Sequence, residues 1–341
     1  MKKILIVTGP GGDAQGWGNM KVTETVCETL NDRGKSAEIA YVESLDDFLR
    51  AIEGKPCDIV WSALYCISRR EDIIGISGEA DWVADILDDR GIPYVGPSSL
   101  TMKQLIQKYE THRIMREHGV QVPDHHLVDI GGEIPDVAFP AFVKPNCESR
   151  SIGISDESVV HSPSELAARV RFIHEKLEEA ALIEEYLPGK EYTVLMLGNG
   201  RFQEILPGLV TVDPSHYGKY AILRTDLRGV GLTKISIPTE KAEEAADLGR
   251  RATDALNCLD HVRVDMRVGA DGRLRVIEIN GIPGLKPFKS WSPQLYSLYH
   301  PSGRGHMEEY KDMLHLVVDS ALERYGIREE SAADPRAAGG A

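Results

Sequence analysis

One stretch, RVDMRVGADGRLRVIEINGIPG at residues 263–284, constrains the fold more than any other part of the chain. Two segments with period-two alternation flank Gly-Ala-Asp-Gly, which is the pattern of a β-hairpin with a short turn. If Val268 pairs with Arg273 across that turn, the antiparallel ladder places Arg263 opposite Glu278. The stretch therefore predicts a hairpin with charged side chains on one face.

Three oxygen-bearing side chains gather on that face. The same register places Asp265 opposite Val276, so that Asp265 and Glu278 become diagonal neighbours about 7 Å apart. Asn280 follows on the same face, beside Arg263. Two carboxylates so close repel each other unless a cation lies between them, and oxygen ligands select a hard ion. The pattern predicts a site that holds Mg²⁺ or Mn²⁺ against substrate phosphates. The alternative is a charged, solvated hairpin face.

The composition limits the classes of partner and compartment. The 341 residues carry a formal charge of −14, which disfavours nonspecific binding to nucleic acid or to an anionic membrane. No apolar run reaches membrane-spanning length, and the apolar stretch in MKKILIVTGPGG is too short for a secretory signal. The five cysteines show no CxxC or zinc spacing, which is typical of a reduced protein. We expect a cytoplasmic protein without nucleic-acid or membrane partners.

The amino-terminal part alternates strands and helices, with the glycine-rich loop GPGGDAQGWG after the first strand. The expected strands are 4–8, 39–42, 58–63 and GIPYVG, and the expected helices are 22–30 and 81–89. This order predicts a doubly wound α/β domain over residues 1–98. The glycines do not fit G-x-G-x-x-G, so a dinucleotide site is the weaker alternative to a loop that contacts substrate.

Two later segments carry lysines that suit phosphate groups. A helical pattern over 100–118 contains Lys108. FPAFVKPNCESRSIGIS then predicts a strand that carries Lys144, a polar loop and a returning strand. A lysine on a buried strand needs an anion, and a loop with Ser149 and Ser151 offers backbone amides to phosphates.

ALIEEYLPGKEYTV predicts a buried strand that ends at a Pro-Gly turn. The strand end carries Glu184, Glu185, Tyr186 and Leu187, and Glu191 follows the turn. Backbone amides, apolar side chains and carboxylates together suit an adenine edge and ribose hydroxyls. The alternative is an exposed acidic strand end.

The last third of the chain contains an irregular segment and two helical patterns. Residues 207–235, with SHYGKYAILRTD, lack periodicity and are typical of a functional lid. Helices are expected at 240–256 and 308–325, and the tail from 328 is expected to be disordered.

Taken in order, these segments resemble an ATP-grasp ligase, most closely the D-alanine–D-alanine ligase family, over about Tyr94 to Pro287. YVGPSS with the following helix resembles the entry to the family's ATP-binding region, which implies that Lys108 contacts the nucleotide. FPAFVKPNCESRSIGIS resembles the strand and phosphate loop, which implies Lys144 on the α and β phosphates and Ser151 over them. LIEEYLPGKEYTV resembles the adenine hinge, which implies adenine contacts from Glu184, Glu185, Tyr186 and Leu187 and a ribose contact from Glu191.

YGKY resembles the family's flexible loop, and RVD with EINGIPG resembles its metal and substrate segment. The resemblance implies that Lys219 covers the γ-phosphate of ATP. It also implies that Mg²⁺ or Mn²⁺ is held by Asp265, Glu278 and Asn280. A substrate carboxylate then attacks the γ-phosphate, and an amine attacks the resulting acylphosphate. Arg263 and the amides near Gly284 stabilise the tetrahedral oxyanion.

The resemblance also implies a three-subdomain α/β architecture. Its parts are an amino-terminal domain at 1–98, a central ATP-grasp subdomain at 99–187, a carboxyl-terminal subdomain with the metal site at 188–326, and a disordered tail at 327–341. Related ligases are commonly homodimers through the amino-terminal domain, which implies the same assembly here.

The sequence departs from the family pattern where substrate is bound. The glutamate that holds the ammonium of the first D-alanine is absent from the glycine-rich loop, where Gln15 lies nearest and Asp13 is the alternative. In the phosphate loop, Arg150 replaces a small residue. After the final Pro-Gly, the family's Ser-Leu is replaced, and Lys289 or Ser290 is expected to hold the second substrate's carboxylate.

An added arginine and a lost carboxylate favour a substrate with an extra anionic group or without a free ammonium. We therefore predict a carboxylate–amine ligase for small, amino-acid-like substrates, with Arg150 at the site and a first substrate other than D-alanine. The alternatives are a true D-alanine–D-alanine ligase of cell-wall synthesis, an ATP-binding regulatory module without turnover, and a nicotinamide-dependent oxidoreductase. The intact metal segment disfavours the module, and the central lysines disfavour the oxidoreductase.

Overall fold

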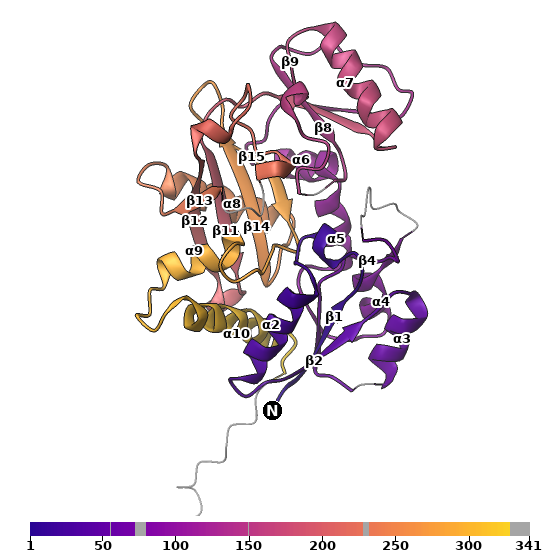
Figure 1. Ribbon diagram of the computed structural model, residues 1–341, viewed down its shortest axis with the longest axis vertical. Coiled ribbons are helices and arrows are strands. Elements are labelled where there is room, and N and C mark those ends of the chain that lie inside the picture. The colour runs from indigo at the N-terminus through magenta and orange to yellow at the C-terminus, as the bar shows by residue number, and fades with distance from the viewer. Residues whose placement is uncertain (55, 72–79, 149, 228–231, 328–341) are drawn as a thin grey trace, which may run out of the picture.

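The computed structural model of the protein describes residues 1–54, 56–71, 80–148, 150–227 and 232–327. Ser149 of the expected phosphate loop and the tail from 328 lie outside the described residues. Within them, the elements form three bodies, each built around its own sheet (Figure 1).

The amino-terminal body is a four-stranded parallel sheet in the order β2-β1-β3-β6. Successive side chains of the central strand β1 point to opposite faces, and both faces are covered. Ile4 and Ile6 pack with α2, whereas Leu5 and Val7 pack with α3 and α4. The predicted doubly wound arrangement is confirmed. The elements are β1 (Lys3–Thr8), α1 (Gly12–Gln15), α2 (Met20–Asn31), β2 (Ser36–Tyr41), α3 (Leu45–Gly54), β3 (Ile59–Ser62), β4 (Cys66–Ile67), β5 (Asp81–Trp82), α4 (Val83–Asp89) and β6 (Tyr94–Val95).

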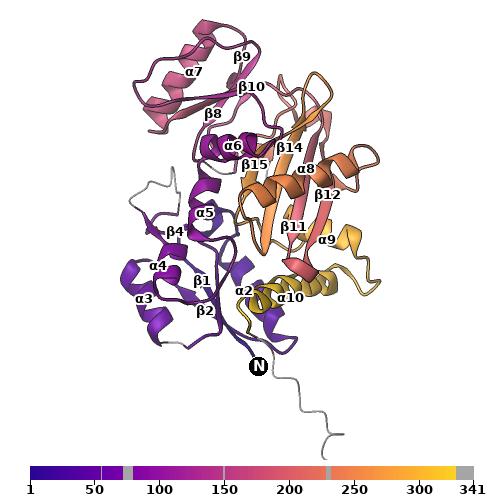
Figure 2. The same ribbon diagram turned by 180° about the vertical axis from the view of Figure 1, so that it is seen from behind.

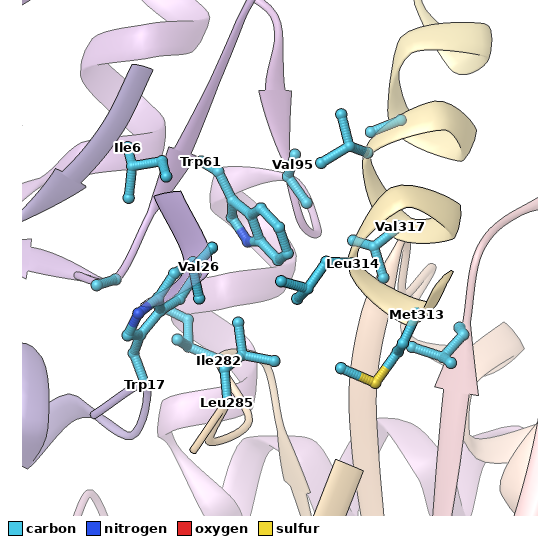
Figure 3. Packing of buried hydrophobic residues seen from close by; sticks show 14 of the residues in the cluster. Ile6, Trp17, Val26, Trp61, Val95, Ile282, Leu285, Met313, Leu314 and Val317 are labelled. Carbon is cyan, nitrogen blue, oxygen red and sulfur yellow. The ribbon is translucent and has the colours of Figure 1, made fainter. Parts of the chain in front are cut away.

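The carboxyl-terminal helix α10 (His306–Arg324) packs on this amino-terminal body, beside α2 (Figures 1 and 2). Figure 3 shows Leu314 and Val317 of α10 facing Trp61 and Val95 of the parallel sheet. Ile282, which follows the last strand of the third body, lies in the same cluster. One hydrophobic core therefore joins the two ends of the chain to the loop after the predicted hairpin.

The central body is an antiparallel sheet in the order β7-β10-β8-β9, with α7 packed on it (Figure 2). The single helix expected over 100–118 is wrong, because Gln107 adopts an extended conformation and divides it into α5 and α6. None of the helices in the described residues combines the length and apolar character needed to cross a bilayer. The elements are α5 (Ser99–Ile106), α6 (Lys108–Glu117), β7 (His125–Val128), β8 (Ala141–Pro145), η1 (Asp156–Ser158), β9 (Val159–Val160), α7 (Pro163–Lys176) and β10 (Ala181–Glu185).

The third body is a five-stranded antiparallel sheet in the order β13-β12-β11-β14-β15, with α8 across one face (Figure 2). The irregular segment expected over 207–235 is shorter than predicted, since β12 continues to Val212 and β13 begins at Thr233. The elements are β11 (Glu191–Leu197), η2 (Gly200–Phe202), β12 (Glu204–Val212), η3 (Pro214–His216), η4 (Thr225–Leu227), β13 (Thr233–Ser236), α8 (Ala242–Ala255), β14 (His261–Val268), β15 (Leu274–Asn280) and α9 (Trp291–Tyr299).

The predicted hairpin is formed by β14 and β15, but its predicted register is wrong. Val268 pairs with Leu274 instead of Arg273, and the register shifts again after Met266. The shift leaves Ile277 without a partner on β14, as in a β-bulge. Asp265 therefore lies directly opposite Glu278, not diagonally across from it.

Candidate active site

Two cavities meet between the three bodies. The first cavity, of about 730 Å³, lies between the central sheet and the β14–β15 hairpin. The second cavity, of about 1490 Å³, lies between the glycine-rich loop after β1 and the loop after β15. Lys108, Glu148 and Glu278 line both cavities, so the two spaces share one boundary. This boundary brings residues from α6, the loop after β8 and β15 together.

Lys144 and Glu184 form a buried ion pair in the first cavity, with 2.9 Å between Nζ and Oε2. They lie diagonally across the β8–β10 ladder, because Lys144 pairs with Leu182 and Glu184 with Phe142. Burial raises the pKa of the Glu184 carboxyl, while Lys144 acts in the opposite direction. The pair therefore keeps a lysine ammonium in a buried position where an isolated charge would be unstable.

The bulge at Ile277 supports this lysine. The Lys144 ammonium donates to the Ile277 carbonyl at 3.2 Å, and His112 Nε2 lies 3.3 Å from the same oxygen. Burial and then the charge of Lys144 lower the pKa of His112 well below its usual range, so its imidazole is neutral. A carbonyl left free by a register shift thus links the hairpin to the central sheet.

Lys108 begins α6, directly after the break at Gln107. Its side chain is buried, and its ammonium donates to the carbonyls of Asn146 and Glu148. Its backbone N–H also donates to the Asn146 carbonyl at 3.2 Å. The helix break therefore places the Lys108 ammonium against the loop that follows β8, at the boundary of the two cavities.

The loop after β8 has an unusual backbone. Arg150 and Ser151 adopt left-handed conformations with φ of 54° and 61°, and Gly153 follows with φ of 72°. Ser151 lines the first cavity, whereas Arg150 lines the second. Arg169 of α7 donates to the Gly153 carbonyl, which ties the returning part of the loop to the central body. The left-handed turn therefore divides two adjacent side chains between two cavities.

The segment expected to hold adenine lines the first cavity. Its members there are Glu184, Glu185, Tyr186, Leu187 and Glu191, together with the apolar side chains of Phe142, Ile154, Ile222, Leu223 and Ile277. The Glu185 carboxylate pairs with Arg275 at 3.1 Å, and the Glu185 amide donates to the Asp124 carbonyl. An apolar slot with a few polar groups suits a planar heterocycle.

The predicted metal ligands lie at the end of the hairpin next to the boundary. Asp265 is buried and accepts hydrogen bonds from Arg263 Nε at 2.8 Å, Arg263 Nη2 at 2.7 Å, Thr193 Oγ1 at 2.8 Å and Asn280 Nδ2 at 3.1 Å. Glu278, directly opposite, faces both cavities. No three His, Cys, Asp or Glu side chains form a metal-binding group within the described ranges. Two carboxylates and an amide fit Mg²⁺, which takes few protein ligands and completes its shell with phosphates and water.

Arg263 and Gly284 line the second cavity. The Arg263 guanidinium binds Asp265 through two nitrogens and lies 4.7 Å from the centre of the Trp291 ring. A Cβ at Gly284 would lie 2.7 Å from Ser290 Oγ, so only glycine fits without a shift. The predicted oxyanion-stabilising groups are therefore on one wall of this cavity.

Lys219 is not brought to either cavity in this conformation. Its backbone N–H donates to Asp156 Oδ2 at 2.7 Å, and it lines a separate hollow beside η1 and α7. The neighbouring Tyr220 contacts His161 Nε2 through its hydroxyl at 2.7 Å. These contacts attach the segment between β12 and β13 to the central body, and the γ-phosphate role of Lys219 stays a prediction.

Gln15 does not offer a free side chain to the second cavity. It is buried, and its amide donates to the Cys66 carbonyl at 2.9 Å and accepts from the Cys66 N–H at 3.1 Å. Asp13, in contrast, is exposed and pairs with Arg150, with 3.2 Å between Oδ2 and Nη1. Of the two candidates for the substrate ammonium, Asp13 is the one whose charge reaches the cavity.

Four residues that the sequence reasoning missed belong to this site or support it. Arg267 lines the first cavity and donates to the Gly189 and Ala221 carbonyls. Its period-two spacing from Asp265 was a usable signal. Thr193, His112 and Tyr65 gave no signal, because their partners are remote in the sequence.

Comparison with known proteins agrees with this geometry. The family described as D-ala D-ala ligase C-terminus matches residues 114–298, more than half of the chain. The D-alanine–D-alanine ligase of Desulforudis audaxviator is 26% identical over 95% of this chain and 100% of its own length. The uncharacterized protein y4sG of Sinorhizobium fredii is 29% identical over 74% of this chain and 73% of its own.

The solved D-alanine–D-alanine ligase of Bacillus anthracis has the same fold, with a TM-score of 0.71 at 20% identity, covering 96% of this chain and 99% of the other. A structure of that enzyme complexed with ATP gives a TM-score of 0.67. The predicted superfamily, fold class, enzyme class and cofactors are confirmed by these similarities. The chain therefore belongs to the D-alanine–D-alanine ligase family of ATP-grasp enzymes, which form a carbon–nitrogen bond between a carboxylate and an amine with ATP and Mg²⁺.

Proposed function

We propose that this ligase forms a dipeptide-like amide bond through an acylphosphate, with release of ADP and phosphate, and that its first substrate is not D-alanine. The observation that supports the ligase geometry is the shared boundary of the two cavities at Lys108, Glu148 and Glu278. A nucleotide in the first cavity and an acid in the second would meet at this boundary, next to the hairpin carboxylates.

The roles that we propose follow from position. Bound MgATP supplies the phosphoryl group that activates the acid. Lys144 and Lys108 hold phosphate oxygens from the floor of the first cavity, and Ser151 covers them. Asp265 and Glu278 hold the metal together with Asn280. The apolar slot around Leu187 excludes water from the base.

The acid side of the site supports a substrate other than D-alanine. Gln15 uses its amide to hold the turn at Cys66. Arg150, which replaces a small residue of the family pattern, adds a guanidinium to the cavity wall. A small apolar amino acid offers no partner for that guanidinium, whereas an acid with a further anionic group does.

The second candidate is a true D-alanine–D-alanine ligase. The Desulforudis audaxviator relative, which carries that name, is matched over its entire length. We further propose that the enzyme works in the cytoplasm as a homodimer on amino-acid-like acids and amines.

The deciding experiment supplies purified protein with MgATP and D-alanine alone, and in parallel with pairs drawn from D- and L-amino acids and related acids. ADP release is followed by a coupled assay, and products are identified by mass. We expect little ADP from D-alanine alone and an amide product from another acid. Robust ADP release with D-alanyl-D-alanine as product would establish the second candidate instead.

A further inference from the structure

We propose that the first substrate is an amino acid that carries a second carboxylate, with its ammonium bound by Asp13 and its additional carboxylate bound by Arg150. This inference rests on the proposed function and names the chemical class of its acid substrate. It is carried by one ion pair that crosses the second cavity.

Asp13 and Arg150 come from different bodies of the protein. Asp13 lies in the glycine-rich loop after β1, and Arg150 lies in the left-handed turn after β8. Both line the second cavity, where Arg150 Nη1 contacts Asp13 Oδ2 at 3.2 Å and the Asp13 carbonyl at 3.0 Å. The two charges therefore close one side of the cavity by pairing with each other.

This pair can be exchanged for a ligand. The Arg150 and Asp13 side chains are 45% and 56% exposed, and an ion pair of that exposure contributes only about 0–1 kcal/mol. A ligand with an ammonium and a carboxylate replaces one such pair by two charge-assisted contacts inside a cavity that the ligand itself dries. A ligand with one of the two groups leaves the other protein charge without its partner.

The other charged groups around the cavity are already engaged. Arg263 is held by Asp265, and Lys108 donates to backbone carbonyls. Glu278 lies at the boundary with the first cavity, where the metal is expected. These contacts leave Asp13 and Arg150 as the charged pair best placed to read the body of the acid.

The carboxylate that reacts cannot be the one that Arg150 binds. The reacting carboxylate has to face the boundary near Glu278 and Lys108, where phosphoryl transfer would take place. An anion held by Arg150 is therefore an additional group. The Asp13 carboxylate beside it would repel a diacid that lacks a positive charge, so the substrate also needs an ammonium.

Hydroxylamine tests this class without knowledge of the natural amine. It attacks the acylphosphate at the carbonyl carbon, which forms the carbon–nitrogen bond of a hydroxamate and expels phosphate. The acids are aspartate and glutamate in both configurations, their amides asparagine and glutamine, the ammonium-free succinate and glutarate, and D-alanine. ADP and hydroxamate are measured with MgATP and each acid.

We expect one amino diacid to exceed its amide and its ammonium-free analogue in kcat/KM by about tenfold or more. Arg150→Met should remove the preference over the amide, and Asp13→Asn should remove the preference over the ammonium-free acid. The matched controls Arg171→Met and Asp129→Asn change exposed charges outside both cavities and should leave both preferences intact. MgADP affinity, measured by calorimetry, should be unchanged in all four variants.

Three results overturn the inference. Equal use of an amide and its diacid removes the role of Arg150, while the proposed ligase with another acid still stands. Hydroxamate only from acids outside the amino diacids rejects the class in the same way. Hydroxamate from D-alanine that matches or exceeds the diacids overturns both this inference and the proposed function.

Discussion

The hydroxyl of Tyr65 accepts a hydrogen bond from the backbone N–H of Ile282 at 2.8 Å. Tyr65 follows β3 of the amino-terminal body, and Ile282 follows β15 of the third body. The Leu285 N–H completes the connection by donating to the Trp17 carbonyl at 3.0 Å. The loop after β15, which contains Gly284, is therefore positioned by residues more than two hundred positions earlier in the chain.

Tyr65→Phe should leave the Ile282 N–H buried without a partner, at a cost of about 1–3 kcal/mol. The displaced loop should lower kcat by about tenfold, because Gly284 moves away from the reacting carbonyl, while KM for ATP stays unchanged. Hydrogen exchange at Ile282 should become faster in the variant. Tyr299→Phe removes a tyrosine hydroxyl bonded to the Pro207 carbonyl and is the matched control. Unchanged exchange, or faster exchange with wild-type kcat, would contradict the positioning role.

Glu278→Gln should abolish turnover by more than about 100-fold and leave the fold intact. The amide keeps the size of the side chain but removes the charge that faces both cavities opposite Asp265. ADP release over a range of Mg²⁺ concentrations measures the loss, and circular dichroism checks the fold. Glu175→Gln on the exposed side of α7 serves as the control. A variant with retained turnover would show that the metal site lies elsewhere.

Lys144→Met should destabilise the protein by about 3 kcal/mol, since it leaves the buried Glu184 without its partner. The double variant Lys144→Met with Glu184→Leu should recover most of the free energy of unfolding but bind MgADP at least about tenfold more weakly than wild type. Urea unfolding and calorimetry measure the two effects. Lys176→Met, at an exposed lysine, should change neither. Wild-type affinity in the double variant would remove Lys144 from the nucleotide site.

Stability should fall as the solution is acidified below the ordinary histidine pKa of about 6.5. Burial and then the charge of Arg263 lower the pKa of His261 to about 3, and burial lowers the pKa of His112 in the same direction. Between about pH 6.5 and 3, the unfolded chain binds a proton at His261 that the folded chain does not. The free energy of unfolding is therefore highest above this window and decreases by about 1.4 kcal/mol per pH unit for each such histidine.

Urea unfolding of wild type and His261→Gln from pH 7.5 to 5 isolates this contribution. The variant should lose about one proton's worth of slope, while the exposed control His126→Gln should keep the wild-type slope. Parallel slopes in wild type and His261→Gln would show that His261 already titrates in the folded protein.

Local patterns predicted the elements of the fold well where one segment decides its own structure. The apolar run of β1 and the alternation in β14 and β15 identified these strands, because side-chain period and burial are properties of consecutive residues. The order of the lysines, the acidic strand end and the hairpin identified the family, which the match to residues 114–298 confirms. The break at Gln107 left no comparable signal, since no Gly or Pro marks it.

The sequence by itself determined which residue types are available: two buried lysines, a hinge with carboxylates, and the Asp265, Glu278 and Asn280 set. Only the tertiary structure decided which of them meet. The bulge at Ile277 places Asp265 opposite Glu278 and frees a carbonyl for Lys144, and neither effect follows from alternation. Gln15 is engaged with Cys66, whereas Asp13 reaches Arg150, because contacts between remote segments depend on how three separate sheets pack together.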